Sequence, residues 1–357
     1  MAEMGVSRYA LIMAGGQGTR FWPYSTEEKP KQFLDIIGGS SLISQTYDRL
    51  REFIPAENVF VIADKKYLAL TLDAIPELKE SNYIAEPSPR NTAPCLILAN
   101  IVISRMDPDA TLLVVPADHY IPEKDVFARE MANAMDAAEE RVIVTSGVKP
   151  YIPHTGYGYI KFNSSTPSEV DGTVFFNVEE FREKPSLEVA EQYISEGNYF
   201  WNSGMFIYKL KYFKEFLDEY APDYHKFYCE LEKNSGDTER FDRIFSEVVP
   251  ESIDYVLMEK VKEVKMFGAG FTWNDVGAWL SVYELNDKDE NRNVDIGDNI
   301  IIGSENSLIY STENKPVALI GLENVAVINT ENGILVADMS RLQSVKDVVT
   351  RLKEERS

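Results

Sequence analysis

The sequence is poor in the residues from which metal centres and disulfide frameworks are built. It contains two cysteines and three histidines among 357 residues. Cys95 and Cys229 lie far apart and have no metal-binding spacing, so the simplest interpretation is two small apolar side chains in a reducing compartment. The histidines form no cluster, and His119 is interpreted as structural or as a residue that supports a neighbouring metal ligand. These absences give no support to a cysteine or histidine metal centre, or to a disulfide-stabilised secreted domain.

Positive charge is also scarce. The chain has 36 lysines and arginines against 58 aspartates and glutamates, which gives a formal net charge of −22. Nucleic-acid-binding proteins carry a basic face that gains affinity by releasing counterions from phosphates, so no nucleic-acid partner is expected. A small anionic ligand can still bind a local cluster of cations.

No long hydrophobic run is present at the start of the chain. The apolar stretch at residues 8–13 is too short for the core of a signal peptide or for a membrane span. We therefore expect a cytoplasmic protein without a membrane partner. Its length suggests two domains or one large one.

What the sequence does have is a glycine-rich loop directly after a short apolar strand. The strand is predicted at residues 8–13, and the loop, residues 14–33, reads AGGQGTRFWPYSTEEKPKQF. Its three glycines are Gly15, Gly16 and Gly18, and its cations include Arg20 and Lys31. Glycines allow a tight turn that exposes consecutive backbone N–H groups, which bind anions. The loop is therefore predicted to bind a polyphosphate.

Two better-known glycine loops do not fit these residues. The dinucleotide-binding fingerprint is Gly-x-Gly-x-x-Gly followed at once by a helix. In this loop Phe21 takes the position of the last glycine, and Pro23 and Pro30 prevent an immediate long helix. The phosphate loop of NTPases needs Gly-Lys-Ser/Thr after a glycine and four residues, and that string is absent.

The loop resembles the signature of sugar nucleotidyltransferases, the enzymes that join a nucleoside triphosphate to a sugar 1-phosphate. The form Gly-Gly-x-Gly-Thr-Arg-x-Trp-Pro-x-Ser, followed by Pro-Lys-Gln-Phe, is most similar to the mannose-1-phosphate guanylyltransferase branch. The branch usually has arginine where this chain has Thr26. The resemblance implies catalytic roles for Arg20 and Lys31, and it implies nucleotide binding by Ala14, Gly15, Gly16, Gly18 and Thr19.

Strands and helices alternate after the loop, which is typical of a parallel sheet with helices on both faces. Strands are predicted near residues 58–62, 82–85, 111–115 and 141–145, with helices near 41–50, 66–72, 92–106 and 127–139. Residues 151–183 indicate added antiparallel strands, and 211–260 indicate helices. The fold class is α/β, with a mostly parallel Rossmann-like nucleotide-binding sheet and ligands expected at the carboxyl ends of its strands.

The last part of the sequence has a different pattern. Short apolar strands recur between residues 299 and 336, and a helix is predicted from about residue 340 to 354. Such strands indicate a small β-rich domain or short β-helix. We therefore predict a catalytic domain over residues 1–288 and a β-helix domain over residues 289–357. Short apolar strands leave faces that are often covered by a partner, so a homodimer through this region is expected.

Two acids are candidate magnesium ligands. Asp118 follows the apolar strand at residues 111–115, and Mg²⁺ is usually held by one or two carboxylates plus substrate phosphates. Asp275 lies in Trp-x-Asp-Val-Gly, which resembles the family's second metal-binding motif. The resemblance implies that the two acids hold one ion from two strand ends. The alternative for each is an aspartate that only stabilises a turn.

Three further stretches resemble parts of the family that bind the sugar phosphate. In Phe-Arg-Glu-Lys-Pro at residues 181–185, Lys184 is implied to contact the phosphate and Glu183 a sugar hydroxyl. Asn202 lies in a stretch that is implied to line the sugar pocket, where Gly156 allows close approach of the backbone. His154 stands where the family more often has an acid.

The stretch at residues 86–93 follows a predicted strand and resembles the part of the superfamily that reads the nucleobase. It offers Glu86, Pro87, Arg90, Asn91 and Thr92. A carboxylate only accepts hydrogen bonds, and guanine presents two adjacent donors, so Glu86 favours guanine. The alternatives are a glutamate in solvent or one paired with Arg90.

The function implied is magnesium-dependent transfer of GMP from GTP to α-D-mannose 1-phosphate, which gives GDP-mannose and pyrophosphate. Two alternatives remain open: a related enzyme with another sugar or base, and a non-catalytic nucleotide-sugar sensor on the same fold. The presence of both catalytic cations and both acids favours the enzyme.

Overall fold

The chain packs into two compact units. The computed structural model describes residues 7–16 and 18–356, and Gln17 of the glycine-rich loop lies outside them. The first unit comprises Met1–Gly15, Thr46–Ala117 and Ile121–Trp273; the second comprises Gly16–Gln45, Asp118–Tyr120 and Asn274–Ser357. The domain boundary between residues 288 and 289 stays a prediction. Each unit therefore combines segments that lie far apart in the sequence.

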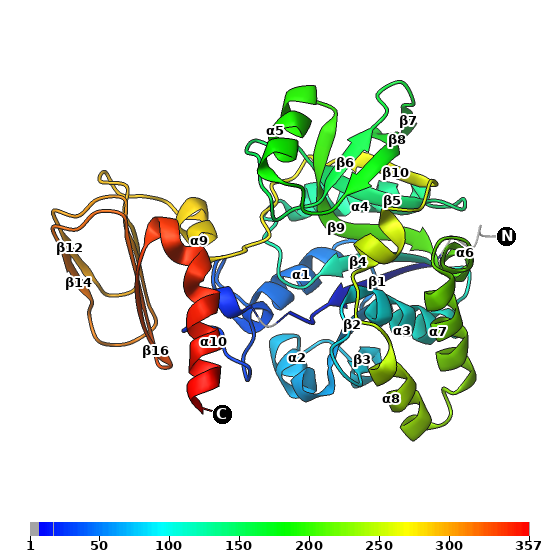
Figure 1. Ribbon diagram of the computed structural model, residues 1–357, viewed down its shortest axis with the longest axis horizontal. Helices are drawn as coiled ribbons and strands as arrows, with labels where there is room; N and C mark the ends of the chain where they lie inside the picture. Colours follow the sequence, from blue (N-terminus) through cyan, green and yellow to red (C-terminus); the bar gives the residue numbers. More distant parts are fainter. Residues whose placement is uncertain (1–6, 17, 357) are drawn as a thin grey trace. The chain divides into compact units, whose positions relative to one another are not determined.

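A large mixed sheet forms the centre of the first unit (Figure 1). One half is parallel, in the order β3 (Tyr83–Glu86), β2 (Val59–Asp64), β1 (Arg8–Met13) and β4 (Thr111–Pro116). The order continues through β9 (Tyr199–Lys209), β5 (Ile143–Val148), β10 (Val264–Gly268), β8 (Thr173–Arg182) and β6 (Tyr159–Phe162), and β7 (Ser168–Val170) pairs with β8. The predicted parallel arrangement therefore holds for the first half of the sheet.

The long strand β9 was not predicted from the sequence. It lies antiparallel between β4 and β5 and separates two strands that the alternating pattern would make neighbours. Buried and partly exposed residues alternate along its first half, as they do on a strand with two different faces. Its pairing partners are distant in the chain, so local periodicity carries little information about its place in the sheet.

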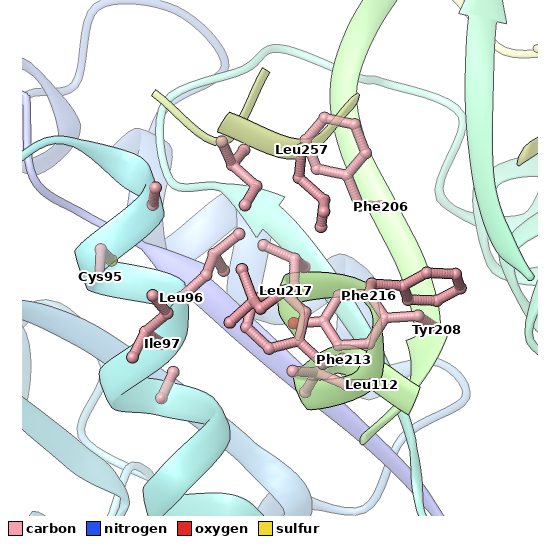
Figure 2. Packing of buried hydrophobic residues seen from close by; sticks show 14 of the residues in the cluster. Cys95, Leu96, Ile97, Leu112, Phe206, Tyr208, Phe213, Phe216, Leu217 and Leu257 are labelled. Carbon is pink, nitrogen blue, oxygen red and sulfur yellow. The ribbon is translucent and has the colours of Figure 1, made fainter. Parts of the chain in front are cut away.

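Helices cover both faces of this sheet. Their bounds are α1 (Leu42–Arg51), α2 (Leu68–Ala74), α3 (Thr92–Ser104), α4 (Lys124–Ala137), α5 (Leu187–Glu196), α6 (Leu210–Tyr220), α7 (Pro222–Lys233) and α8 (Thr238–Glu247). Leu112 of β4 packs with Leu96 of α3 and Phe213 of α6 in one continuous apolar core (Figure 2). Figure 1 shows α4 on the other side of β4. The α/β class with covered sheet faces is confirmed.

The second unit contains a short β-helix. Parallel strands β11 (Val294–Ile296), β13 (Leu308–Ser311) and β15 (Val325–Thr330) form one wall, which β16 (Gly333–Asp338) extends, and β12 (Ile300–Ile302) pairs with β14 (Ala318–Ile320) in another. Hydrogen bonds between polar side chains and residues 18 positions apart connect successive coils, as in Asn329 Nδ2 to Ser311 Oγ at 3.0 Å. The predicted β-helix is confirmed.

The glycine-rich loop is part of the same core as this β-helix. Phe21 lies in the short helix η1 (Thr19–Phe21) and packs against Trp279 of α9 (Trp279–Leu285), with ring centroids 5.2 Å apart. Trp279 Nε1 donates to the carbonyl oxygen of Trp22 at 3.1 Å. The hydroxyl of Tyr310 donates to the backbone carbonyl oxygen of Asp35 at 2.8 Å. The loop from Gly16 onward is therefore held by residues that come more than 240 positions later.

The chain ends in a helical segment that packs on the loop. It consists of η7 (Met339–Ser344) and α10 (Val345–Arg356). The buried side chains of Leu342 and Val345 join the core that contains Phe21, and Lys353 pairs with Glu27 at 2.5 Å. Within residues 7–16 and 18–356, no helix has the length and apolar character needed to cross a membrane.

Candidate active site

A cavity of about 370 Å³ in the second unit brings four sequence-predicted residues together. Arg20 and Lys31 of the glycine-rich loop line it, and so do the two candidate metal ligands Asp118 and Asp275. Gly18, Thr19 and His119 also line it. These residues come from three separate segments of the chain and meet at one place that is rich in charge.

Lys31 is the most constrained cation of this cavity. It begins the short helix η2 (Lys31–Phe33), and only 5% of the residue is exposed. Its Nζ donates to Asp118 Oδ2 at 2.8 Å and to the backbone oxygen of Asp275 at 2.6 Å. A Cβ on Gly18 would lie 2.3 Å from the Cβ of Lys31, and Gly18 has φ +62°. Glycine is required there for both reasons, and it allows the loop to close over the lysine.

Asp118 lies two residues beyond β4, where the sequence placed it. Burial alone would raise the pKa of its carboxyl, but the nearby positive charges of Lys31 and His119 and the hydrogen bond from Lys31 lower it below its usual range. The side chain is therefore a carboxylate in the neutral pH range.

Asp275 does not follow a strand end, which corrects one expectation. The strand β10 ends at Gly268, and Asp275 comes after a single antiparallel bridge between Tyr120 and Asn274. That bridge brings the segment beside Tyr120, two positions after Asp118. The next residue, Val276, is fully buried at φ +46°, a strained conformation for a β-branched side chain. Strain of this kind is found preferentially at functional sites.

The two acids fit a magnesium ion that is held jointly with a substrate. Mg²⁺ usually keeps several waters and takes one or two protein carboxylates plus substrate phosphates, and two carboxylates line this cavity. Among the residues that the structure describes, no group of three or more His, Cys, Asp or Glu side chains is placed to hold a metal ion. Two carboxylates are within the number that Mg²⁺ takes from a protein when substrate phosphates supply other ligands.

Lys346 also lines this cavity, and no sequence motif predicts it. Its position is set by the buried neighbour Val345, which packs into the same core as Phe21. Lys346 itself is exposed. A lysine in a charged terminal helix carries no local sign of a binding role, so only the packing of the last helix identifies it.

The residues that begin the loop are placed differently. Ala14 is buried, and its N–H donates to the carbonyl oxygen of Ile62 at 2.9 Å. Gly15 and Gly16 are exposed, and a Cβ added to Gly16 would meet nothing within 4 Å. A side chain at Gly16 would therefore meet open space, whereas one at Gly15 would come into contact with Glu86.

Glu86 is not exposed to solvent, and among the described residues no salt bridge joins it to Arg90. It is the last residue of β3, and only 4% of it is exposed. Burial, with a smaller contribution from the charge of Asp64, raises the pKa of Glu86 to about 7, although a hydrogen bond with Cys95 opposes the shift. A Cβ on Gly15 would lie 3.9 Å from Glu86 Oε2. Glu86 therefore lies beside the start of the glycine-rich loop.

In the rest of this stretch, some side chains make hydrogen bonds that hold the fold, and others have buried polar atoms without a hydrogen-bond partner. Asn91 has φ 67° and its side chain accepts from the N–H of Thr92 at 2.8 Å, which starts α3. Thr92 Oγ1 accepts from the N–H of Ile253 at 2.8 Å. Ser88 Oγ and Arg90 Nε are buried without a hydrogen-bond partner in the described part of the chain. Pro87 is half-buried between them and Glu86.

The candidate sugar-phosphate residues form a second cluster in the first unit. Lys184 Nζ donates to Glu183 Oε1 at 2.7 Å, and Glu183 is largely buried. A Cβ on Gly158 would lie 2.5 Å from Glu183 Oε2 and 3.2 Å from the Cβ of Asn202. The structure therefore brings Glu183, Lys184 and Asn202 together, and Gly158 is the glycine that allows their approach.

Gly156 makes a different contact. Its N–H donates to His154 Nδ1 at 3.2 Å, and the ring of His154 stacks on Tyr157 with centroids 3.8 Å apart. The backbone N–H of Lys184 donates to the carbonyl oxygen of Tyr157 at 3.2 Å. His154 and Gly156 thus shape the turn that carries Tyr157.

Comparison with known proteins identifies the class to which this fold and these residues belong. Residues 9–292 match the family model described as "Nucleotidyl transferase", and residues 297–352 match the model described as "MannoseP isomerase/GMP-like beta-helix domain". The chain belongs to the nucleotidyl transferase family.

Several similar proteins are named mannose-1-phosphate guanylyltransferase. One from Escherichia coli is 37% identical over 350 residues, which cover 96% of this chain and 75% of the relative. The xanthan biosynthesis protein XanB of Xanthomonas campestris pv. campestris (strain B100) is 36% identical over 349 residues, or 96% of this chain and 73% of the relative. The resemblance that the sequence indicates is confirmed, and the chain is an enzyme of the nucleotidyltransferase class.

A solved structure matches the fold of nearly the whole chain. The crystal structure described as mannose-1-phosphate geranyltransferase from Thermus thermophilus matches with a TM-score of 0.87 at 30% identity. The match covers 97% of this chain and 99% of that one. Both the nucleotidyltransferase part and the β-helix part are therefore shared.

Proposed function

We propose that this enzyme transfers GMP from GTP to α-D-mannose 1-phosphate in a magnesium-dependent reaction that gives GDP-mannose and pyrophosphate. The observation that carries the proposal is the cavity in which Lys31 is held between Asp118 and the backbone of Asp275, with Arg20 alongside. A polyphosphate needs such cations, and a metal that arrives with it needs such carboxylates. The choice of sugar and base is supported by the relatives that are named mannose-1-phosphate guanylyltransferase.

The reaction is an in-line displacement at the α-phosphorus of GTP. A phosphate oxygen of mannose 1-phosphate forms the new P–O bond while the bond to pyrophosphate breaks, and the electron pair leaves with pyrophosphate. The sugar phosphate is already a competent nucleophile, so the difficulty lies in repulsion between anions and in their alignment. A covalent enzyme intermediate is not needed.

Each charged residue has one role in this scheme. Lys31 already uses two of its N–H groups on Asp118 and Asp275, which leaves the third to donate to a phosphate oxygen. Arg20 and Lys346 neutralise the outer phosphates and the pyrophosphate that leaves. Lys184 contacts the phosphate of the sugar substrate. Asp118 and Asp275 would hold Mg²⁺, which would screen the negative charge of the phosphates.

The base and sugar are selected by other residues. Glu86 accepts hydrogen bonds from N1–H and the 2-amino group of guanine, and Arg90, with its buried Nε, is available to the nucleotide. Glu183 and Asn202 provide an acceptor and a donor for sugar hydroxyls. A hydroxyl of the wrong configuration leaves these buried groups without partners, and that reduces binding.

The direct test is an assay with purified protein, Mg²⁺, the four common nucleoside triphosphates and a panel of sugar 1-phosphates, scored by release of pyrophosphate. The highest kcat/KM is expected for GTP with mannose 1-phosphate. A different best pair would establish a related enzyme with another sugar or base. Tight binding of a nucleotide sugar without any release of pyrophosphate would instead favour the sensor.

Replacing Lys346 with glutamine should weaken binding of pyrophosphate by about three- to ten-fold, because one exposed charge at a phosphate contributes roughly 1 kcal/mol and is screened by salt. The measurement is calorimetric titration of the Mg²⁺-loaded enzyme with pyrophosphate at low and high salt. Lys353→Gln is the matched control, since Lys353 lies on the same helix but pairs with Glu27. If wild type and Lys346→Gln bind pyrophosphate with equal affinity, Lys346 is not part of the proposed site.

We also propose that the enzyme is a homodimer joined through the outer face of the β-helix. Ile300 and Ile302 of β12 and Ile320 of β14 are between 53% and 64% exposed on two paired strands. We call these three side chains the apolar outer face. A second copy of the chain can cover it because a twofold dimer pairs one surface patch with itself.

The double substitution Ile302→Lys with Ile320→Lys should convert the dimer to monomers, with the dimer dissociation constant raised at least about ten-fold, because each buried isoleucine contributes roughly 1.5–3 kcal/mol. Light scattering over a range of protein concentrations measures it. Ile334→Lys on β16, also exposed, is the control. Unchanged mass of the double variant, or a monomeric wild type, would contradict this interface. Truncation after residue 288 is a poorer test because it also removes core partners of Phe21.

A further inference from the structure

The cluster around the candidate sugar-phosphate residues contains a carboxyl that the proposed function does not use. Asp254 begins the π-helical turn η6 (Asp254–Met258) in the first unit. Its Oδ1 accepts a hydrogen bond from Asn202 Nδ2 at 3.1 Å. Ile253 and Val256 on either side of it are buried in the main core. Single π-helical turns are rare and occur frequently at functional sites, which marks this one for attention.

The contact with Asp254 fixes which way the amide of Asn202 points. Asn202 Oδ1 accepts from the N–H of Gly204 at 3.0 Å, and the backbone N–H of Asn202 donates to the carbonyl oxygen of Gly158 at 2.8 Å. A flipped amide would set its oxygen against the carboxyl of Asp254 and its NH₂ against the N–H of Gly204. Asn202 is therefore held with one Nδ2 hydrogen on Asp254 and the second available to a ligand.

The charges around Asp254 favour its neutral form. The charged groups that act on it are Glu183 and Lys184, which follow β8, and the two are paired at 2.7 Å. Tyr255 and Glu259 of its own segment lie near this pair, and Glu259 Oε1 accepts the backbone N–H of Glu183 at 3.1 Å. Burial, and next the negative charge of Glu183, raise the pKa of Asp254 to about 7.

We propose that Asp254 is a positioning residue of the sugar subsite, which orients Asn202 toward a sugar hydroxyl and limits the negative charge that meets the incoming sugar phosphate. This inference deepens the proposed function and rests on it. Below its pKa, the neutral carboxyl holds Asn202 and adds no charge next to Glu183. Above its pKa, a second carboxylate stands at a site that must receive an anion, and the affinity for the sugar phosphate falls.

The experiment compares Asp254→Asn, Asp254→Ala and the wild type by steady-state kinetics between pH 6 and 8.5. In Asp254→Ala, the KM for mannose 1-phosphate should rise about 10- to 100-fold while the KM for GTP changes less than about two-fold, because only the orientation of Asn202 is lost. In the wild type, the KM for mannose 1-phosphate should rise about three- to ten-fold across pH 7. Asp254→Asn keeps an acceptor for Asn202 and should lose most of this rise.

The control is Asp242→Asn, which removes the same charge from an exposed position on α8 in the same unit. Any ionisation of the sugar phosphate itself affects all variants equally, so the difference between wild type and Asp254→Asn isolates Asp254. Calorimetric binding of mannose 1-phosphate gives a second readout that does not depend on turnover. If Asp254→Ala does not fold, the pH profile of Asp254→Asn decides alone.

The outcomes separate this inference from the proposed function. If the wild type does not release pyrophosphate with any of the sugar 1-phosphates tested, the proposed function is overturned, and this inference with it. An active wild type whose Asp254→Asn variant shows the same pH profile as the Asp242→Asn control would overturn only the inference. Equal changes in the KM values of both substrates would show that Asp254 supports the fold without positioning Asn202.

Discussion

Replacing either Asp118 or Asp275 with asparagine should lower turnover by roughly two to four powers of ten, the range for losing one preorganised electrostatic element. Both side chains line the cavity that contains Arg20 and Lys31. Asparagine keeps the size of the side chain but removes the charge that holds Mg²⁺. Residual activity should need a higher concentration of Mg²⁺, which a magnesium titration at saturating GTP measures. Thermal melting should show that both variants remain folded.

The two acids differ in a way that sharpens this experiment. Lys31 donates to the carboxylate of Asp118, whereas its hydrogen bond to Asp275 goes to the backbone oxygen, which asparagine keeps. If the acids serve only to position Lys31, Asp118→Asn loses activity and Asp275→Asn does not. If the two acids hold the metal, both variants lose activity. Asp298→Asn, an exposed acid of the same unit, is the matched control. Near-normal activity of either variant at saturating Mg²⁺ would show that the residue is only a turn aspartate.

Glu86→Gln should reduce kcat/KM for GTP by about 5- to 150-fold, which corresponds to roughly 1–3 kcal/mol for poorly paired polar groups. A smaller loss is expected for UTP and dTTP, because an amide can both donate to and accept from a pyrimidine. The side chain is 4% exposed at the end of β3. In this position a lost or reversed hydrogen bond is not replaced by water.

The pH dependence provides an independent check on Glu86. Burial raises its pKa to about 7, so the side chain is partly protonated near neutrality. The N–H donors of guanine bind its ionised form, so affinity for GTP should rise as the pH increases from 6 to 8, and Glu86→Gln should lack this dependence. Glu80→Gln, an exposed acid just before β3, is the control. Equal losses for every nucleotide would mean that Glu86 shapes the loop without reading the base.

Much of the fold was accessible from the sequence because its signals are local. The apolar strands β1, β2 and β4 and the helix α3 fall close to their predicted ranges, since each is a short or periodic run bounded by polar residues or turns. The glycine-rich loop was identified by its pattern. Asp118 was identified because an acid directly follows a buried strand.

The missed features depend on contacts between distant segments. Strand β9 pairs with β4 and β5, and nothing in its own residues specifies these partners. Lys346 reaches the cavity only because the last helix packs on the loop. Asp254 had one available signal, an acid inside the apolar run from Ile253 to Met258, which is an unusual place for a carboxylate without a partner.

The contacts that hold the loop also set the order in which the protein can mature on the ribosome. Trp22 and Asp35 are synthesised early, but their partners Trp279 and Tyr310 come 257 and 275 residues later. At about 5–20 residues per second, those partners emerge roughly 10 to 60 seconds after the loop. Throughout this interval the aromatic side chains of the loop lack their native cover and are open to chaperones and proteases. Catalytic competence is therefore acquired late in translation, however early the large sheet forms.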